Sequence, residues 1–527
     1  MFIRKIRKVT KNKTYTSVYL AESYRQNGKV RHRHLANLSH WPQDLVDKLQ
    51  KVLKGEKFFE LQSLNLSLYK SFGAIKVVSE ISERLCIKQA LGSGREGKLA
   101  LFQIAGRIIT QGSRYYLANE WKQLQAIEEI FRLKNFNHND LYKNLEWLSK
   151  NQSQIERKIY QYRSKNKKIK NIFLYDVTSS YLEGEQNELA AYGYNRDKKE
   201  GKKQLVIGLL TDESGYPVSV EVFKGNRSDM TTVSNQLKKL KENFGVERVV
   251  FVGDKGMIKS EQISEIQSSQ YKWHYLTSIT KEQIRTLISA GIVQLELFTD
   301  KVLEVEAEEG VRYILRRNPQ RAEQLKENRE SKIEAIKSFV LEQNEYLKKH
   351  KRAKFEVALR KVNEKIEKLK LSNIVKTIEG QREIKVSINI EELDKTEQLD
   401  GCYVIKTDVP QAELDAQTAH DRYKDLSAVE FAFRTMKTTL EEIRPVYVRK
   451  EENTRGHVFV VMLAYMIIKY ITDALGDLSY SRKYIIECLD KISYIEYEFE
   501  NEKIRTSPKN LLPCQKQILE KLKIKIK

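Results

Sequence analysis

The spacing of apolar residues in the first third of the chain changes from a strand-like pattern to a helical one. Residues 14–24 and 30–38 have the composition of β-strands and flank Asn27-Gly28, a dipeptide that favours hairpin turns because both residues tolerate positive φ. From about residue 61 to 154, apolar residues recur every three or four positions, as in amphipathic helices. The predicted regions are a basic β-hairpin region and a helical region, at 1–55 and 56–170.

Short apolar runs replace the helical pattern from residue 171 onward. Three strands precede a helix, a strand, a second helix and a fifth strand, with predicted bounds of 172–175, 204–210, 217–223, 230–244, 248–252, 260–270 and 273–279. This order predicts an α/β core with a mixed sheet. Asp176 lies on the first strand and Asp254 follows the fourth, so we expect the two carboxylates at neighbouring positions of the sheet.

The core pattern is interrupted over 281–400, which is predicted to be an inserted subdomain. Its expected elements are two strands and a long charged helical stretch, at 301–306, 313–316 and about 322–371. The core resumes with a strand and a single long helix, at 401–407 and 419–440. The expected catalytic core is therefore 171–280 together with 401–475, and a C-terminal helical region follows at 476–527.

The chain carries a large excess of positive charge. Its 527 residues include 94 Lys and Arg against 71 Asp and Glu, a net charge of +23, and residues 1–34 alone hold ten Lys and Arg against Glu22. Such an excess attracts polyanions, either nucleic acid or an acidic membrane surface. A second basic stretch, 157–170, has seven cations and no acidic residue, and its alternative interpretation is a solvated linker.

Membrane insertion and metal-binding cysteines are not indicated by the sequence. The longest apolar run, 458–468, has 11 residues, fewer than the roughly 20 that a spanning helix needs, and is predicted to be a buried core helix. The N-terminus has no apolar signal segment, which predicts a cytoplasmic protein. Cys86, Cys402, Cys488 and Cys514 lie far apart without a C-x-x-C pair, so buried free thiols are expected.

Three carboxylates are the candidates for chemistry. Tyr423, Glu430 and Lys437 are spaced by seven residues, which places them along one stripe of a continuous helix, where Glu430 can meet Asp176 and Asp254. Carboxylates without His or Cys suit Mg²⁺ or Mn²⁺, and a pair of such ions supports phosphoryl transfer. Taken singly, an acidic residue at a strand end is more often a helix cap or part of a solvated turn.

The sequence around these residues resembles a known family. The segments 175–179, 249–256 and 423–437 are similar to the three acidic motifs of the DDE transposases of bacterial insertion sequences, and 223–229 resembles the Gly-Asn loop that follows their third strand. One branch of that family has the signature Y-x2-R-x3-E-x6-K. Tyr423, Glu430 and Lys437 match it, whereas Leu426 stands at the arginine position.

The resemblance implies a ribonuclease H-like fold, with the order β-β-β-α-β-α-β-α, and an active site that holds two divalent ions. By the resemblance, Asp176, Asp254 and Glu430 are the catalytic and metal-binding residues. The residues expected to contact DNA are Tyr423, Arg434, Lys437, Asn226 and Lys255. Arg434 is the favoured replacement for the signature arginine, and Arg422 is the alternative.

The implied function is cut-and-paste DNA transposition. Such an enzyme binds the terminal inverted repeats of its insertion sequence, cleaves DNA at the ends and joins the 3′-OH to target DNA, as a homodimer on paired ends and in association with the nucleoid. Residues 1–150 are the candidate for end recognition. The alternatives are a metal-dependent nuclease without strand transfer and a DNA-binding protein whose catalytic site has decayed; the presence of all three acidic residues disfavours decay.

Overall fold

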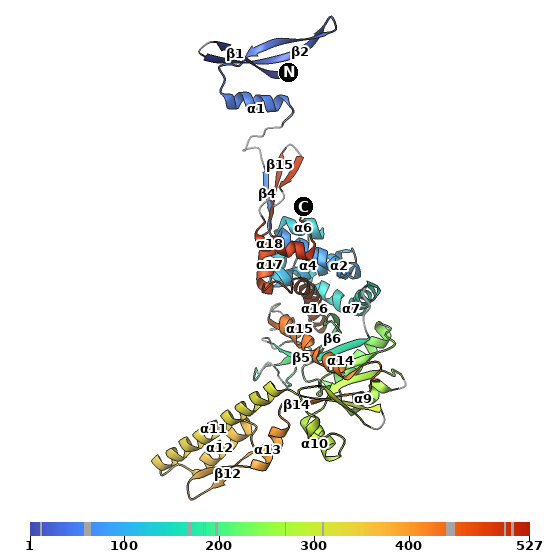
Figure 1. Cartoon of the computed structure of the whole chain (residues 1–527), viewed down its shortest axis with the longest axis vertical. Coiled ribbons are helices and arrows are strands. Elements are labelled where there is room, and N and C mark those ends of the chain that lie inside the picture. The colour runs from blue at the N-terminus through green and yellow to red at the C-terminus, as the bar shows by residue number, and fades with distance from the viewer. Residues whose placement is uncertain are drawn as a thin grey trace. The chain divides into compact units, whose positions relative to one another are not determined.

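The computed structural model describes the chain except residues 11–12, 57–64, 167–170, 183, 185, 195, 197–198, 269, 308–309, 439–447, 500–501, 507–510 and 527. The chain forms two compact units (Figure 1). The smaller unit comprises Met1–Tyr69 with Tyr494–Lys509, and the larger comprises Lys70–Ser493 with Asn510–Lys527.

The smaller unit contains two antiparallel sheets. In the first, β1 (Phe2–Thr10), β2 (Lys13–Gln26) and β3 (Lys29–Asn37) lie in the order β1-β2-β3, and α1 (Gln43–Leu53) packs on one face of it. The predicted hairpin is confirmed: Asn27 and Gly28 connect β2 and β3 with φ of 50° and 75°. The strand β1 was not predicted, because its apolar residues Phe2, Ile3, Ile6 and Val9 do not alternate with the basic ones. The second sheet has the order β16-β15-β4, with β4 at Asn65–Tyr69, β15 at Tyr494–Phe499 and β16 at Glu502–Thr506.

Helices of the larger unit surround a long apolar helix, α16 (Glu451–Ala474). The others are α2 (Phe72–Arg84), α3 (Ile87–Leu91), α4 (Arg95–Ile109), α5 (Arg114–Asn119), η2 (Trp121–Gln123), α6 (Gln125–Phe131), α7 (His138–Asn166), α17 (Arg482–Asp490) and α18 (Pro513–Leu522). The α4 and α7 helices pack on α16, and the buried Arg114 side chain contacts His457 of α16, with 2.8 Å between the nitrogens. The helices expected over 56–170 therefore share a core with a segment about 300 residues later.

By length and composition, α16 is the one helix among the described residues that is apolar enough to cross a membrane. Most of its side chains, including all of Val458–Ile468, are buried inside the larger unit. This confirms the prediction of a core helix. The four cysteines are free, as predicted, but only Cys402 and Cys488 are buried, whereas Cys86 and Cys514 are partly exposed.

A mixed eight-stranded sheet occupies the centre of the larger unit, in the order β10-β11-β14-β9-β8-β5-β6-β7. Its strands are β5 (Ile172–Tyr181), β6 (Gln204–Asp212), β7 (Pro217–Lys224), β8 (Val250–Gly253), β9 (His274–Ser278), β10 (Leu303–Glu306), β11 (Arg312–Arg317) and β14 (Cys402–Thr407). The β5-β8 and β8-β9 pairs are parallel, and the other pairs are antiparallel. Helices α8 (Met230–Lys238), continued by the π-helical η3 (Lys239–Asn243), and α9 (Ser260–Gln267) contribute to its apolar core with Val233, Leu237 and Ile266.

The segment expected to be a separate insertion contributes to this sheet. After α10 (Lys281–Ser289) and η4 (Leu295–Leu297), β10 and β11 extend the sheet beside β14, so 303–306 and 312–317 belong to the core layer. The remaining elements are α11 (Pro319–Lys349), α12 (Phe355–Lys368), β12 (Val375–Glu379), β13 (Ile384–Ile388) and α13 (Ile390–Gln398).

The single helical stretch expected over 322–371 is two helices. The chain turns after α11 and returns as α12, which lets Ile336 and Val340 pack against Val362 in a separate apolar cluster. One continuous helix would leave both apolar faces exposed to water.

Candidate active site

The first two carboxylates come from neighbouring parallel strands. Tyr175 of β5 pairs in register with Gly253 of β8, so Asp176 and Asp254 follow at the same level of the sheet. The order of elements predicted this adjacency. Because side chains alternate along a strand, Asp176 lies on the opposite face of β5 from the buried Tyr175 ring.

The third carboxylate, Glu430, lies on a helix that begins at Leu426, within the range where one longer helix was expected. Residues 419–440 were predicted as one helix, but the structure has α14 (Ala416–Lys424) and α15 (Leu426–Thr438), which are separated at Asp425. At that point the Ala428 N–H bonds to the Asp425 carbonyl, at 2.8 Å and three residues apart, which marks a new helix start. Tyr423 therefore lies on a different helix from Glu430 and Lys437, and the prediction of one continuous helix is wrong. Tyr423 and Glu430 nevertheless line the same cavity.

The two strands and two helices enclose a shared cavity of about 340 Å³. Its walls include all three carboxylates, and the lining residues are Asp176, Asp254, Asn318, Tyr403, Tyr423, Lys424, Leu426, Ser427 and Glu430. Residues separated by more than 250 positions thus lie around one cavity. Leu426, at the place of the signature arginine, gives this wall an apolar side chain instead of a cation.

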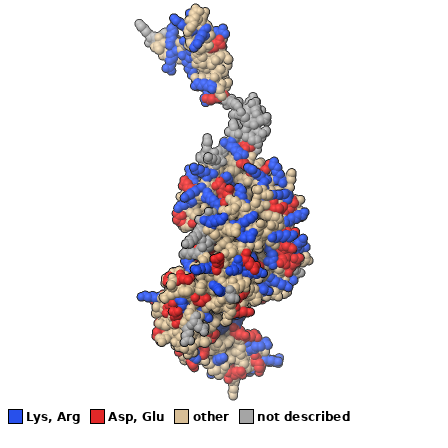
Figure 2. All heavy atoms as spheres, turned by 90° about the vertical axis from the view of Figure 1, so that its right-hand side faces the viewer, with Lys and Arg blue, Asp and Glu red and all other residues tan. Residues whose placement is uncertain are grey.

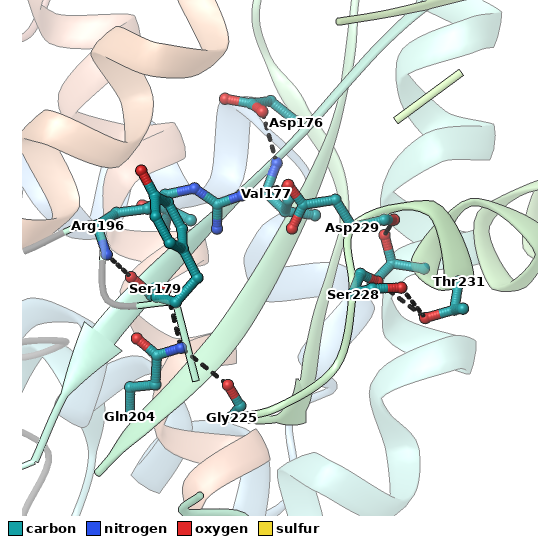
Figure 3. A network of polar contacts seen from close by, with 12 residues as sticks. Asp176, Val177, Ser179, Arg196, Gln204, Gly225, Ser228, Asp229 and Thr231 are labelled. Atoms are coloured by element: carbon teal, nitrogen blue, oxygen red, sulfur yellow. Dashed lines mark hydrogen bonds and ion pairs between the residues drawn. The ribbon is translucent and has the colours of Figure 1, made fainter. Parts of the chain in front are cut away.

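Burial and like charge act together on Asp176. Removal from water raises its pKa to about 7, and the carboxylates of Glu430 and Asp254 add to the increase, whereas the Val177 N–H and the charge of Arg196 oppose it. The Val177 N–H donates to Asp176 Oδ1 at 2.8 Å (Figure 3). The cavity therefore concentrates negative charge at a partly desolvated position.

Tyr423 and Lys437 connect the helices to the strands. The Tyr423 hydroxyl lies 3.2 Å from Asp254 Oδ1 and 2.7 Å from Ser278 Oγ. Burial and the charge of Asp254 raise the pKa of this hydroxyl, so it stays protonated as a donor. Lys437 donates to Thr178 Oγ1 at 2.8 Å and to the Ser179 carbonyl, both on β5. Tyr423 and Lys437, two of the five residues predicted to contact DNA, are thus hydrogen-bonded to protein groups at the edge of the cavity.

The other predicted DNA contacts lie outside the cavity. Arg434 is exposed and lines a neighbouring hollow with Glu430 and Phe431. Lys255 is exposed directly after Asp254, and Asn226 is exposed in the loop after β7. The alternative cation, Arg422, forms an ion pair with Asp425 at 3.0 Å.

Arg196 is a cation at the site that the sequence analysis missed. Its guanidinium pairs with Asp229 at the start of α8, and its backbone N–H donates to Ser179 Oγ at 2.9 Å (Figure 3). Its charge also lowers the pKa of Asp176. The loop between β5 and β6 contains several cations, and no local pattern tells which of them returns to β5.

The glycine of the Gly-Asn loop has a steric role. A side chain at Gly225 would collide with the carbonyl oxygens of Gln204 and Ala191. The Gln204 amide, in turn, donates to the Gly225 carbonyl at 2.8 Å, which fixes the loop against β6 (Figure 3). This close approach holds the segment that leads to Asp229.

Within the part of the chain that the structure describes, no three His, Cys, Asp or Glu side chains form a closed group around a single ion position. The cavity nevertheless offers a suitable donor set, because its acidic groups are all carboxylates, the ligands that Mg²⁺ and Mn²⁺ prefer. Burial is the main cause of the raised pKa of Asp176, and the nearby carboxylates of Glu430 and Asp254 add to it; a bound cation would offset their mutual repulsion.

Two family models match the chain. Residues 3–62 match the N-terminal domain of IS1634 family transposases, and residues 167–467, more than half of the chain, match the transposase DDE domain. The chain is a DDE-type insertion sequence transposase. The second match includes Asp176, Asp254 and Glu430.

Comparison with solved structures shows a distant similarity. The transposase is similar to a piggyBac transposase solved in a synaptic complex with hairpin DNA, with a TM-score of 0.38 and 9% sequence identity over 80% of this chain and 79% of that one. No curated protein matches the transposase.

Proposed function

We propose that this transposase cleaves DNA at the ends of its insertion sequence and joins the 3′-OH to target DNA by two-metal phosphoryl transfer. The observation that carries the proposal is the presence of Asp176, Asp254 and Glu430 on the walls of one cavity. These residues come from a strand, a strand end and a helix that are distant in sequence.

The strand order supports a ribonuclease H-like core. Three antiparallel strands, β5, β6 and β7, are followed by β8 and β9, which run parallel to β5 on its other side. In this arrangement the first and fourth strands are neighbours, which brings their carboxylates together.

The cavity residues have distinct roles in the proposal. Two divalent ions, when bound, activate the attacking oxygen and stabilise the leaving oxygen. Asp176, Asp254 and Glu430 would hold them. Tyr423 orients Asp254 through its hydroxyl, and Lys437 fixes the end of β5 through Thr178.

If DNA is the substrate, positively charged residues must lie beside the acidic cavity. A phosphodiester brings negative charge to a site that is itself acidic, so cations beside the cavity must offset the repulsion. Arg196, Arg434 and Lys255 are the candidates for phosphate contacts, and Asn226 is a candidate at the loop after β7. Water is the nucleophile for end cleavage, and the released 3′-OH is the nucleophile for joining. A homodimer that holds two ends together would complete the reaction.

The test uses a duplex that carries the terminal sequence of the element, a supercoiled target plasmid and Mg²⁺. A transposase yields strands cut at the element end and products joined to the plasmid. Cut ends without joined products would support the alternative of a nuclease without strand transfer. No products, with end binding intact, would support a decayed site and overturn the proposal. The Asp176→Asn protein controls for contaminating nucleases.

A further inference from the structure

The β1-β2-β3 sheet of the smaller unit has one face covered by α1 and one that α1 leaves open. Ile3 packs with Val18 and Val46 in the core beneath α1, and Lys5 lies 3.4 Å from Asp47 of α1. Because side chains alternate along a strand, the even-numbered residues of β1 point away from α1. We call the side of the sheet that α1 leaves open the outer face.

Cations and aromatic rings lie side by side on the outer face. Arg4 is the register partner of Tyr19, and Lys8 is the register partner of Tyr15. The Tyr19 ring stacks on His34 with 4.2 Å between centroids and 8° between planes. On the same face, the Phe2 ring contacts His32 edge-on at 5.3 Å.

The outer face carries no carboxylate. Glu22 is the only acidic residue before Asp44, and it pairs with Arg33 on the face toward α1. Tyr15, Lys8 and His34 are exposed to solvent. Figure 2 shows Lys and Arg grouped along one side of this unit, at the top of the picture, where acidic residues are few.

We infer that the outer face of the β1-β2-β3 sheet binds duplex DNA and distinguishes the ends of the element from other sequences. This inference rests on the proposed function and assigns its end-recognition step to one surface. Arg4 and Lys8 can contact phosphates, and the ring nitrogens of His34 and the hydroxyls of Tyr15 and Tyr19 can bond to base edges. The major groove of DNA admits β-structure of this kind.

The ring geometry favours a duplex over a single strand. Proteins that bind single strands offer free ring faces on which splayed bases stack. Here one face of Tyr19 is already covered by His34, and Phe2 is engaged by His32. The ring contacts of Tyr19 and Phe2 leave less of these rings open to stacking, and the polar groups of the exposed residues Tyr15 and His34 suit the edges of paired bases.

Two double variants of the full-length protein test the choice of face. Arg4→Ala/Lys8→Ala removes two cations from the outer face, and the matched control Lys5→Ala/Arg7→Ala removes two from the other face of the same strand. The probes are a duplex with the terminal sequence of the element and a scrambled duplex of equal composition. We expect the first variant to lower the salt slope of end binding by about two and the control to leave it unchanged. His34→Ala should reduce discrimination between the probes by about tenfold.

A labelling experiment shows directly which face of the sheet the DNA covers, without relying on a loss of affinity that misfolding could also cause. Ser17 is the register partner of Ile6 on the outer face, and Thr16 is the partner of Arg7 on the other face. Ser17→Cys should be protected from alkylation by the end duplex, as quantified on the labelled peptide, whereas Thr16→Cys should not. Equal protection at both positions, or equal losses from both double variants, would overturn the inference. So would an outer-face variant that loses binding only to anionic vesicles.

The failure of this inference is separable from failure of the proposed function. None of the substitutions touches the cavity around Asp176. A wild-type protein that discriminates between the probes but makes no cut would overturn the proposed function and leave this inference standing. Outer-face variants that cleave normally and still discriminate fully between the probes would overturn this inference and leave the proposed function standing.

Discussion

Tyr175 and Gly253 are register partners in the parallel β5-β8 pair, and each directly precedes an acidic residue of the candidate site. The phenol of Tyr175 is buried in the core beneath the sheet, which anchors the strand on which Asp176 stands. A side chain at Gly253 would approach Ile258 to 2.8 Å, so the end of β8 has little room to vary. The two carboxylates are therefore positioned by the rigid centre of the sheet, and Glu430 approaches from α15.

Loss of a single carboxylate should abolish cleavage. For Asp176→Asn, Asp254→Asn and Glu430→Gln, we expect cleavage at least about a thousandfold slower in Mg²⁺, because each loses a charged ligand worth several kcal/mol to the transition state, at about 1.4 kcal/mol per tenfold. End binding, measured by gel shift, should be retained. Glu334→Gln, on the exposed side of α11, is the matched control. A variant that nicks DNA at a substantial fraction of the wild-type rate would remove its carboxylate from the site.

Removal of divalent ions should stop cleavage reversibly. We expect EDTA to abolish it, Mg²⁺ or Mn²⁺ to restore it, and Ca²⁺ to fail in restoring it. Binding should also be detectable without activity, because a ligand at about 100 times its Kd stabilises the folded state by about 2.7 kcal/mol. Differential scanning calorimetry with and without Mg²⁺ measures this, and the Asp176→Asn protein should show a smaller gain. An equal gain in both proteins would place the ions elsewhere.

Tyr423 is expected to act by positioning Asp254. Tyr423→Phe removes the hydroxyl that bonds to Asp254 and Ser278, and the loss of such bonds costs about 0.5–1.5 kcal/mol each. We expect kcat to fall about tenfold with little change in end affinity. Tyr346→Phe, at an exposed position of α11, should leave kcat unchanged. A pure loss of DNA affinity in Tyr423→Phe would indicate direct contact with DNA instead.

Arg196 and Arg434 can each be tested, with Arg422 as the comparison, as replacements for the arginine missing at Leu426. A residue that contacts a phosphate contributes about one unit to the salt slope of binding to cleaved ends. We expect Arg196→Gln and Arg434→Gln each to lower this slope, because the charge of Arg196 acts on Asp176 and Arg434 lies in the hollow beside Glu430. We expect Arg422→Gln to leave the slope unchanged, because Arg422 lines neither that hollow nor the cavity. If Arg434→Gln left both slope and affinity unchanged, Arg434 would have no role at the phosphate.

Deleting N-terminal residues should remove recognition of the element ends without preventing folding only if the deletion stops before the helices that pack on α16. Removing residues 1–150 would take away α4 and part of α7, which pack on α16, so that protein should not fold. Removing 1–54 deletes only the β1-β2-β3 sheet and α1. We expect that protein, once shown to be folded by circular dichroism, to lose discrimination between end and scrambled duplex while keeping most of its low-salt affinity. Unchanged discrimination would place end recognition elsewhere in the chain.

Several features were predictable because their causes lie within a few residues. Asn27-Gly28 forms the β2-β3 turn because these residues tolerate positive φ, and α16 is a buried helix because its apolar run has no hydrated face. The strands that carry Asp176 and precede Asp254 followed from short apolar runs. The family motifs added Glu430, which no local rule singles out.

Other features depend on contacts between residues that are distant in sequence. The split at Asp425 lets Tyr423 reach Asp254 and Ser278 while α15 carries Glu430 along the cavity, and a helical pattern in sequence has no sign of it. The return of Arg196 to β5 depends on Asp229, and the joining of β10 and β11 to the core sheet depends on β14. Sequence alone determined the central strands, the apolar core helix and, through the family motifs, the three acidic residues. Tertiary packing decided where several elements begin and end and which of them meet, because burial and hydrogen bonding between distant segments outweigh the weak local preferences at their boundaries.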